Sequence, residues 1–131
     1  MTEKLIGLAH IGIHISDAEV SKDFYLNKLN FTLKAEEALP NGTKLVFVDA
    51  GSCQLELICP PGGAGRIPAG VVNHIAIECK HIEQWVADLK AKGVAFESDT
   101  IGEMPGLLGG VKNIFFCGPD GERFEFFEYL S

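Results

Sequence analysis

The sequence predicts an α+β protein built from two copies of one βαβββ module. Three observations support this: a repeated strand motif, an amphipathic helix pattern after each copy, and three short apolar runs after each helix. The segment LAHIGIHI (residues 8–15) resembles VNHIAIEC (residues 72–79), with an offset of 64 residues. Internal similarity at a fixed offset is typical of a duplicated unit, so we expect both halves to fold alike.

The first two elements of each half follow from hydropathy patterns. Residues 8–15 and 72–79 alternate between apolar and other side chains, which predicts strands. Residues 17–29 and 82–92 place apolar side chains among polar ones at near-helical spacing. Each strand is therefore expected to lead into an amphipathic helix.

Short apolar runs separated by turn residues predict the remaining strands. They are residues 31–33, 45–48 and 54–58 in the first half, and residues 94–97, 111–117 and 123–129 in the second. The turn sequences are PNG (40–42), DAGS (49–52) and GPDG (118–121).

Segments rich in Gly and Pro divide the chain further. We predict one domain, 1–131, made of a first module at 5–59, a linker at 60–70 and a second module at 71–131. A second Gly-rich segment, residues 102–110, is predicted to be a long loop that closes over a substrate.

Composition excludes several classes of function. The chain has 131 residues, 47% of them hydrophobic, a net charge of -7 and a pI near 5.0. A chain of this size can bury a core without disulfides, and its negative charge disfavours nucleic acid and anionic membranes as partners. Its first residues form no extended apolar stretch with a small-residue cleavage site, and no apolar run approaches the length of a spanning helix, so we expect a cytoplasmic protein. The cysteines lack CxxC spacing and are predicted to be reduced and buried: Cys53, Cys59, Cys79 and Cys117.

The strand alternation places histidines beside small residues. His10, Gly12 and His14 share one face of the first strand, and His74 and Ala76 share the corresponding face of its repeat. The opposite face of each of these strands is aliphatic, so we expect a helix to cover it. The small residues leave space beside each imidazole, which favours a ligand there.

A glutamate occurs at a matching place in the last strand of each half. Glu56 lies 46 residues after His10, and Glu125 lies 51 residues after His74. A single strand His is more often a hydrogen-bonded structural residue, and a single strand Glu is more often solvated. We assign Glu128 to such a solvated surface position, but two matching His/Glu pairs favour one functional centre.

Two imidazoles and two carboxylates suit an open-coordinated Ni, Co, Mn, Fe(II) or Zn ion rather than a structural zinc. Such an ion can hold a substrate through two adjacent oxygens while a proton leaves the neighbouring carbon. The residues therefore indicate isomerisation or epimerisation.

These residues resemble the vicinal oxygen chelate superfamily, the group of glyoxalases, bleomycin-resistance proteins and dioxygenases, over nearly the whole chain. The matching segments are LAHIGIHISDAEVSKDFY, QLELI, VNHIAIE and GPDGERFEFFE. The resemblance implies two βαβββ modules that form an incomplete barrel. In the glyoxalase I (lactoylglutathione lyase) branch, the metal ligands correspond to His10, Glu56, His74 and Glu125. The implied cofactor is Ni or Co, with Zn as the alternative.

The resemblance also implies an activity. It is a methylglyoxal-detoxifying lyase that converts a 2-oxoaldehyde–thiol hemithioacetal into a 2-hydroxyacyl thioester through a metal-bound enediolate. Glu125, or else Glu56, would be the catalytic base. The site would lie in a homodimer, with His10 and Glu56 from one chain and His74 and Glu125 from its partner.

Candidate substrate-binding residues are His14, Met104 and Leu107. His14 and Pro60 stand where glyoxalases commonly carry a basic residue and an amide that contact glutathione. The thiol is therefore left open. The two arginines, Arg66 and Arg123, are predicted to be surface or salt-bridging residues.

Three other functions stay open. One is a methylmalonyl-CoA epimerase-like enzyme, whose ligand on the fourth strand is usually Gln. Another is a metal-free binding protein of the bleomycin-resistance type, which usually lacks the ligand set. A ring-cleaving dioxygenase ranks lower, because Glu56 would occupy a position that O₂ needs.

Overall fold

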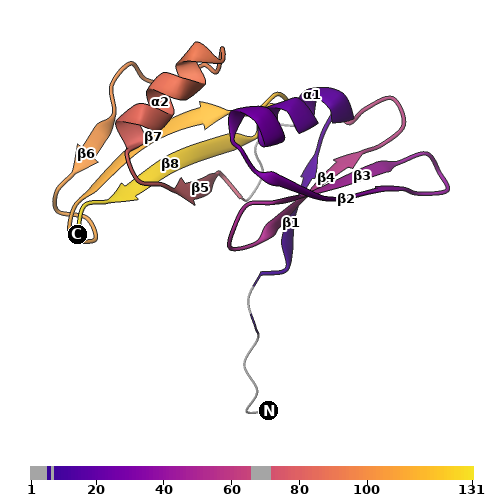
Figure 1. The fold of residues 1–131 in the computed structure, drawn as a ribbon, viewed down its shortest axis with the longest axis horizontal. Helices are drawn as coiled ribbons and strands as arrows, with labels where there is room; N and C mark the ends of the chain where they lie inside the picture. The colour runs from indigo at the N-terminus through magenta and orange to yellow at the C-terminus, as the bar shows by residue number, and fades with distance from the viewer. Residues whose placement is uncertain (1–5, 7, 66–71) are drawn as a thin grey trace. The chain divides into compact units, whose positions relative to one another are not determined.

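The computed structural model describes residue 6, residues 8–65 and residues 72–131. The chain divides into two compact units, Met1–Gly65 and Arg66–Ser131. Figure 1 shows that each unit consists of a sheet with a helical segment. Residues 66–70 of the predicted linker, Arg66 among them, lie outside the described residues. Within the described ranges, no helix is both long and apolar enough to span a bilayer.

The first unit is a four-stranded sheet with the order β1-β4-β3-β2. Its elements are β1 (His10–His14), α1 (Ala18–Lys22), the π-helical turn η1 (Asp23–Lys28), β2 (Thr32–Ala38), β3 (Lys44–Asp49) and β4 (Gln54–Cys59). β1 runs parallel to β4, and the other pairs are antiparallel. The Asp17 carboxylate accepts the backbone N–H groups of Glu19 and Val20, which is why the helix begins there.

The second unit repeats this topology with the order β5-β8-β7-β6. Its elements are β5 (Ile75–Glu78), α2 (Ile82–Ala91), β6 (Gly102–Met104), β7 (Val111–Cys117) and β8 (Arg123–Tyr129). β5 runs parallel to β8, and β7 pairs antiparallel with both of its neighbours. The predicted α+β fold with two βαβββ modules is confirmed.

One predicted strand is wrong. Residues 94–97 form a single bridge, Phe96 with Phe116, and the fourth strand of this sheet is β6. Gly93, with φ 84°, ends α2, and the Val94 N–H then donates to the Leu89 carbonyl. β6 takes the first three residues of the predicted 102–110 loop, because their backbone pairs with β7. The irregular part of this loop is therefore three residues shorter than predicted.

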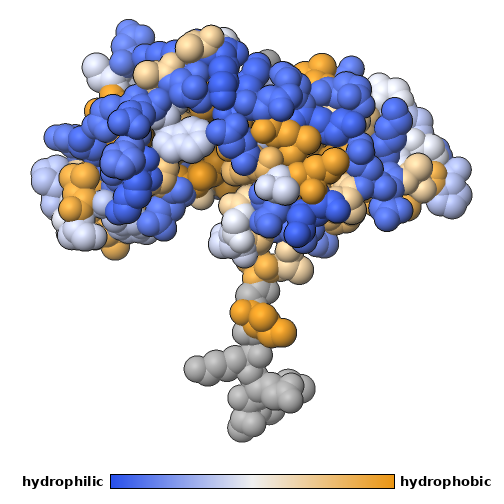
Figure 2. Space-filling view, in the orientation of Figure 1, coloured by the Kyte–Doolittle hydropathy of each residue, from blue (hydrophilic) through white to orange (hydrophobic). Residues whose placement is uncertain are grey.

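The alternation predicted for the first strands is confirmed. His10, Gly12 and His14 are exposed, whereas the isoleucines between them are half-buried. The buried sides of α1, η1 and α2 face the aliphatic sides of the two sheets. On the face of the molecule seen in Figure 2, hydrophilic side chains cover most of the surface over α1 and α2. The buried core residues of the first unit include Ile15, Tyr25, Val48, Leu55 and Leu57, and those of the second include Ile82, Leu89, Phe116, Phe124 and Phe126. The histidine-bearing faces are thus the ones that the helices leave open.

Two sequence predictions about individual residues are wrong. The cysteines are free but not fully buried: three are half-buried and Cys117, at the end of β7, is exposed. Burial raises the pKa of the Cys79 thiol to about 11, so this thiol stays protonated at neutral pH. Glu128 is not a solvated charge. Its carboxylate accepts the backbone N–H groups of His81 at 3.1 Å and Ile82 at 3.0 Å, and so caps α2 from β8.

The Glu128 cap makes the stability of the fold depend on pH. The hydrogen bonds from Ile82 and His81 hold the pKa of Glu128 below its ordinary value of 4.5, against the cost of desolvation. A lowered folded-state pKa stabilises the protein above the unfolded-state pKa, and this contribution is lost as pH falls through the folded-state value. We therefore expect Glu128→Gln to lower the urea midpoint at pH 7 and to lose this effect progressively below pH 4.5. If the urea midpoints of the unmodified protein and Glu128→Gln differed by the same amount at every pH, this cap would be contradicted.

Candidate functional site

The open face of the second sheet brings His74 and Glu125 together. Glu125 pairs with Ala76 across β5 and β8, two residues beyond His74. The His74 Nε2 atom lies 3.2 Å from the Glu125 Oε1 atom. The Phe115 ring meets the His74 ring edge-on, with centroids 5.2 Å apart. Only 8% of the Glu125 side chain is exposed, so this carboxylate is largely enclosed.

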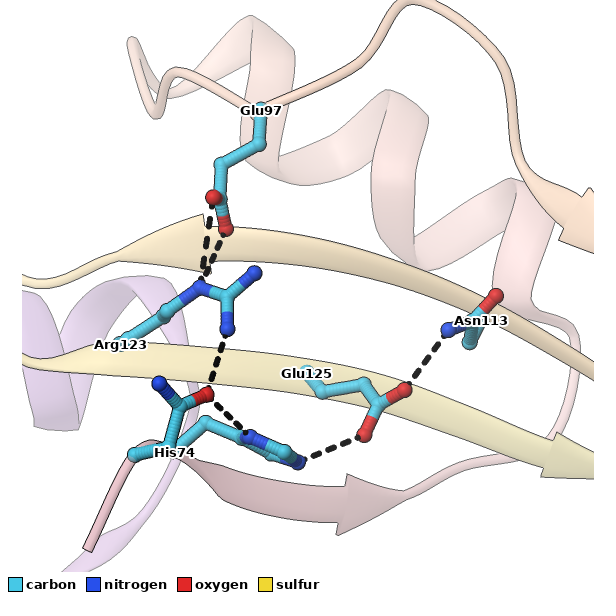
Figure 3. Close-up of polar contacts among 6 residues, drawn as sticks. His74, Glu97, Asn113, Arg123 and Glu125 are labelled. Atoms are coloured by element: carbon cyan, nitrogen blue, oxygen red, sulfur yellow. Dashed lines mark hydrogen bonds and ion pairs between the residues drawn. The ribbon is translucent and has the colours of Figure 1, made fainter. Parts of the chain in front are cut away.

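A chain of polar contacts holds the His74 ring. The His74 Nδ1 atom lies 2.9 Å from the Asn73 Oδ1 atom, and Arg123 donates from Nη1 to the same oxygen at 2.7 Å. Arg123 itself is held by Glu97, whose two carboxylate oxygens accept from Nε at 2.9 and 3.3 Å. Figure 3 shows these contacts running from Glu97 through Arg123 toward His74.

This chain determines which nitrogen of His74 is free. A guanidinium only donates, so the Asn73 atom that faces it must be the amide oxygen. That oxygen only accepts, so the His74 Nδ1 atom must carry the hydrogen. In the neutral ring the Nε2 atom then presents a lone pair toward Glu125.

Asn113 holds the Glu125 carboxylate from the other side. Its Nδ2 group donates to Glu125 Oε2 at 2.7 Å, whereas the other oxygen faces His74 (Figure 3). Oε1 and the bare Nε2 are two electron-rich atoms 3.2 Å apart. A proton or a metal ion between them resolves their repulsion, and imidazole nitrogen with carboxylate oxygen is a donor set that divalent transition metals accept. The pair therefore fits the metal that the sequence implies.

The first sheet holds the equivalent pair, His10 and Glu56, in a looser form. The His10 Nε2 atom lies 3.6 Å from the Glu56 Oε1 atom, and 46% of the His10 side chain is exposed. The Phe47 ring meets His10 edge-on with centroids 6.0 Å apart. A Cβ on Gly12 would lie 3.7 Å from Glu56 Oε1, so this position leaves the carboxylate open. Within the described residues, no asparagine or arginine contact supports this pair.

Each unit thus supplies two donors. In either unit the described His, Cys, Asp and Glu side chains form no group of three or more that could hold a metal ion. A complete centre of the predicted kind requires both pairs.

Of the predicted substrate-binding residues, His14 lies in the first unit, and Met104 and Leu107 lie in the second. His14 is exposed at the end of β1, and Met104 ends β6 opposite Val111 of β7. Leu107 is 42% exposed in the turn after β6. Their roles remain predictions.

Three residues of this site were not predicted from the sequence: Asn73, Asn113 and Arg123. Arg123 was predicted to be a surface or salt-bridging residue, and its ion pair with Glu97 agrees with that, but its contact with Asn73 was not predicted. A usable signal was the repeat itself, because Asn73 precedes the second histidine where Ala9 precedes the first.

Comparisons with known proteins agree with this architecture. The model of the Glyoxalase/Bleomycin resistance protein/Dioxygenase superfamily matches residues 7–126. The chain is 33% identical over 104 residues to the mitochondrial methylmalonyl-CoA epimerase of Mus musculus, a match covering 73% of this chain. The chain spans 58% of the length of that relative.

Solved structures share the fold over nearly the whole chain. A glyoxalase family protein from Enterococcus faecalis is 26% identical, with a TM-score of 0.74 and coverage of 97% of this chain and 98% of the other. The trypanothione-dependent glyoxalase I of Leishmania major has a TM-score of 0.75 at 24% identity, covering 91% of this chain and 84% of its own. The second likeness concerns the fold alone.

Proposed function

Because the chain belongs to the glyoxalase/bleomycin resistance protein/dioxygenase superfamily, we propose that it is a metal-dependent enzyme that moves a proton on a carbon next to a carbonyl group. The observation that supports this most directly is that each sheet brings an imidazole Nε2 atom and a carboxylate Oε1 atom together, at 3.6 and 3.2 Å. We propose that His10, Glu56, His74 and Glu125 bind one divalent ion, Ni²⁺ or Co²⁺ before Zn²⁺. The two pairs would come from different chains of a homodimer.

The proposed reaction is of the glyoxalase I type. The substrate is the hemithioacetal of a 2-oxoaldehyde and a thiol, and the product is a 2-hydroxyacyl thioester. When bound, the divalent ion polarises the two adjacent oxygens of the substrate and makes the neighbouring C–H bond acidic. Glu125 takes the proton from the carbon that carries sulfur and returns it to the adjacent carbon, while the hydroxyl proton passes from the oxygen of the first carbon to the oxygen of the second. No other group enters or leaves, so the step is an isomerisation.

The surroundings of Glu125 suit a base. Its carboxylate is buried beside Phe115, where water is largely excluded and electrostatic effects are strong. The Asn113 hydrogen bond orients the carboxylate by fixing Oε2, and Oε1 faces His74, on the side where the ion and the substrate would bind. Glu56 is the second candidate, with a side chain that is more exposed, at 20%.

A second candidate function is epimerisation of an acyl-CoA thioester. The 33% identity to the mouse epimerase favours it, and so does the absence of the usual glutathione contacts at His14 and Pro60. In that reaction one carboxylate removes the α-proton and the other returns a proton to the opposite face of the same carbon. A pair of carboxylates, Glu56 and Glu125, suits this chemistry too.

Metal titration tests the binding of a divalent ion, on which both candidate reactions depend. We expect calorimetry of metal-stripped protein to show one Ni²⁺ per chain, with weaker binding in Glu56→Gln and in His74→Ala. Glu78→Gln is a matched control, because Glu78 is exposed on the same sheet as His74 and lies outside both pairs. Absence of Ni²⁺ binding in the unmodified protein would contradict both candidate reactions and favour a metal-free binding protein.

Subunit mixing tests the shared-site arrangement. If each site takes one pair from each chain, a heterodimer of His10→Ala and His74→Ala subunits has one intact site. A random mixture should then regain roughly a quarter of the Ni²⁺ sites and of the activity. No recovery after verified subunit exchange would place all four ligands in one chain.

Two assays then separate the reactions. Thioester formation from methylglyoxal with glutathione or another thiol would support the glyoxalase reaction. Exchange of the α-proton of methylmalonyl-CoA in D₂O, without that thioester formation, would assign the epimerase reaction instead.

A further inference from the structure

We propose that Asn73 and Arg123 are positioning residues that select the Nδ1–H form of His74 and so prepare its Nε2 atom for a cation. The contacts that carry this proposal are the 2.9 Å contact of His74 with Asn73 and the 2.7 Å hydrogen bond from Arg123 to Asn73. The inference deepens the proposed function and rests on it for the role of the metal. Its first test, however, needs no metal.

The two halves of the chain provide an internal comparison. Strand register makes Phe47 and Phe115 equivalent, because each lies opposite the glutamate of its own half. Both rings meet the local histidine edge-on, at interplanar angles of 87° and 90°. The arrangement of histidine, glutamate and phenylalanine is therefore common to both halves.

The supporting polar residues are not common to both halves. By the same register, Ala9, Leu45 and Gln54 occupy the places that Asn73, Asn113 and Arg123 occupy in the second half. The imidazole–carboxylate distance is 3.6 Å in the half without these residues and 3.2 Å in the half with them. The added residues thus coincide with the tighter pair.

Three contacts hold the Arg123 guanidinium in place, so that it can orient the exposed amide of Asn73. Glu97 accepts from its Nε group, the Phe115 ring lies 3.9 Å from its guanidinium carbon, and Asn73 accepts from Nη1. Without the guanidinium, the Asn73 amide can rotate and present its NH₂ group to His74. That rotation would favour a hydrogen on Nε2, where Glu125 can accept it, and would block the nitrogen that a metal needs.

The first test reads the tautomer in metal-free protein. We would record two-bond ¹⁵N–¹H correlations of the imidazole rings in mildly alkaline buffer. The His74 signals would be assigned by their loss in His74→Ala. The unmodified protein should carry the His74 hydrogen on Nδ1, and Asn73→Ala should move it to Nε2. Asn73→Asp keeps an acceptor and should restore the Nδ1–H form.

The second test measures Ni²⁺ affinity in the same variants. Loss of a residue that orients a ligand typically costs about 10- to 100-fold in metal affinity, and we expect this loss for Asn73→Ala. Arg123→Met should lose less, about 10-fold or below, because Asn73 retains one of its two orientations. Gln54→Ala, the register equivalent of Arg123 in the first half, should change neither the tautomer nor the affinity.

The results separate this inference from the proposed function. If the unmodified protein binds no Ni²⁺, the proposed metal site fails, while the tautomer measurement still decides whether Asn73 selects the Nδ1–H form. If Asn73→Ala leaves both the tautomer and the Ni²⁺ affinity unchanged, the positioning role is overturned. Asn73 is exposed, so its truncation opens no core cavity that could explain a change.

Discussion

Replacing Glu125 by Gln is expected to lower kcat by about 10²- to 10⁴-fold, the usual contribution of a positioned general base. A glutamine side chain cannot accept the substrate proton, although it keeps the size and shape of the carboxylate. Asn113 holds Oε2 of Glu125, and only 8% of the side chain is exposed, so the unmodified base is both oriented and shielded from water. The measurement is kcat and KM in whichever assay is positive, together with the metal content of each variant.

Two further variants make this prediction specific. Glu56→Gln removes the equivalent carboxylate of the first half and should lower kcat less than Glu125→Gln at equal metal content. Glu78→Gln removes an exposed carboxylate from the same sheet and should leave kcat unchanged. If Glu56→Gln lost more kcat than Glu125→Gln, Glu56 rather than Glu125 would be the catalytic base.

Replacing Phe116 by Ala is expected to lower the free energy of unfolding by about 3–5 kcal/mol. Phe116 is fully buried in β7, on the face of the second sheet that packs against α2. Its ring centroid lies 5.6 Å from that of Phe124, 4.7 Å from that of Phe126 and 5.5 Å from that of Phe96. Truncation would leave a cavity among three rings that backbone pairing holds in place.

Urea unfolding followed by tryptophan fluorescence would measure this loss. The single tryptophan, Trp85, lies in α2 with its ring 5.8 Å from the Phe126 ring, so its emission reports on this cluster. Leu130→Ala, at a position that is 51% exposed, should change the free energy of unfolding by less than about 0.5 kcal/mol. Equal effects of the two substitutions would show that the cluster does not stabilise the second unit.

Much of the fold could be predicted from local patterns. The repeat placed a strand and a helix in each half, and strand alternation placed His10 and His74 on open faces, as the structure shows. Glu56 and Glu125 could be assigned to the same faces by the same rule, because side chains alternate in every strand and flanking leucines or phenylalanines mark the buried side. The register then pairs Gly12 with Glu56 and Ala76 with Glu125.

The predictions that failed concern contacts between residues far apart in the chain. Residues 94–97 have the composition of a strand, but the edge of the second sheet is filled by β6, which contains Gly102 and pairs with β7. Glu128 was predicted to be a solvated surface charge because the backbone N–H groups that donate to its carboxylate, those of His81 and Ile82, precede it by more than 40 residues.

The sequence by itself determined the duplicated module, the open and covered faces of its strands, and the two His/Glu pairs. These depend on periodicity and on residue type, which are local properties of the chain. Only the tertiary structure decided how the pairs differ. Asn73 and Arg123 meet across 50 positions of the chain, and Asn113 meets Glu125 from a neighbouring strand. A hydrogen bond forms only where folding brings donor and acceptor within reach, so the polar support around His74 comes from strand pairing rather than from any local pattern.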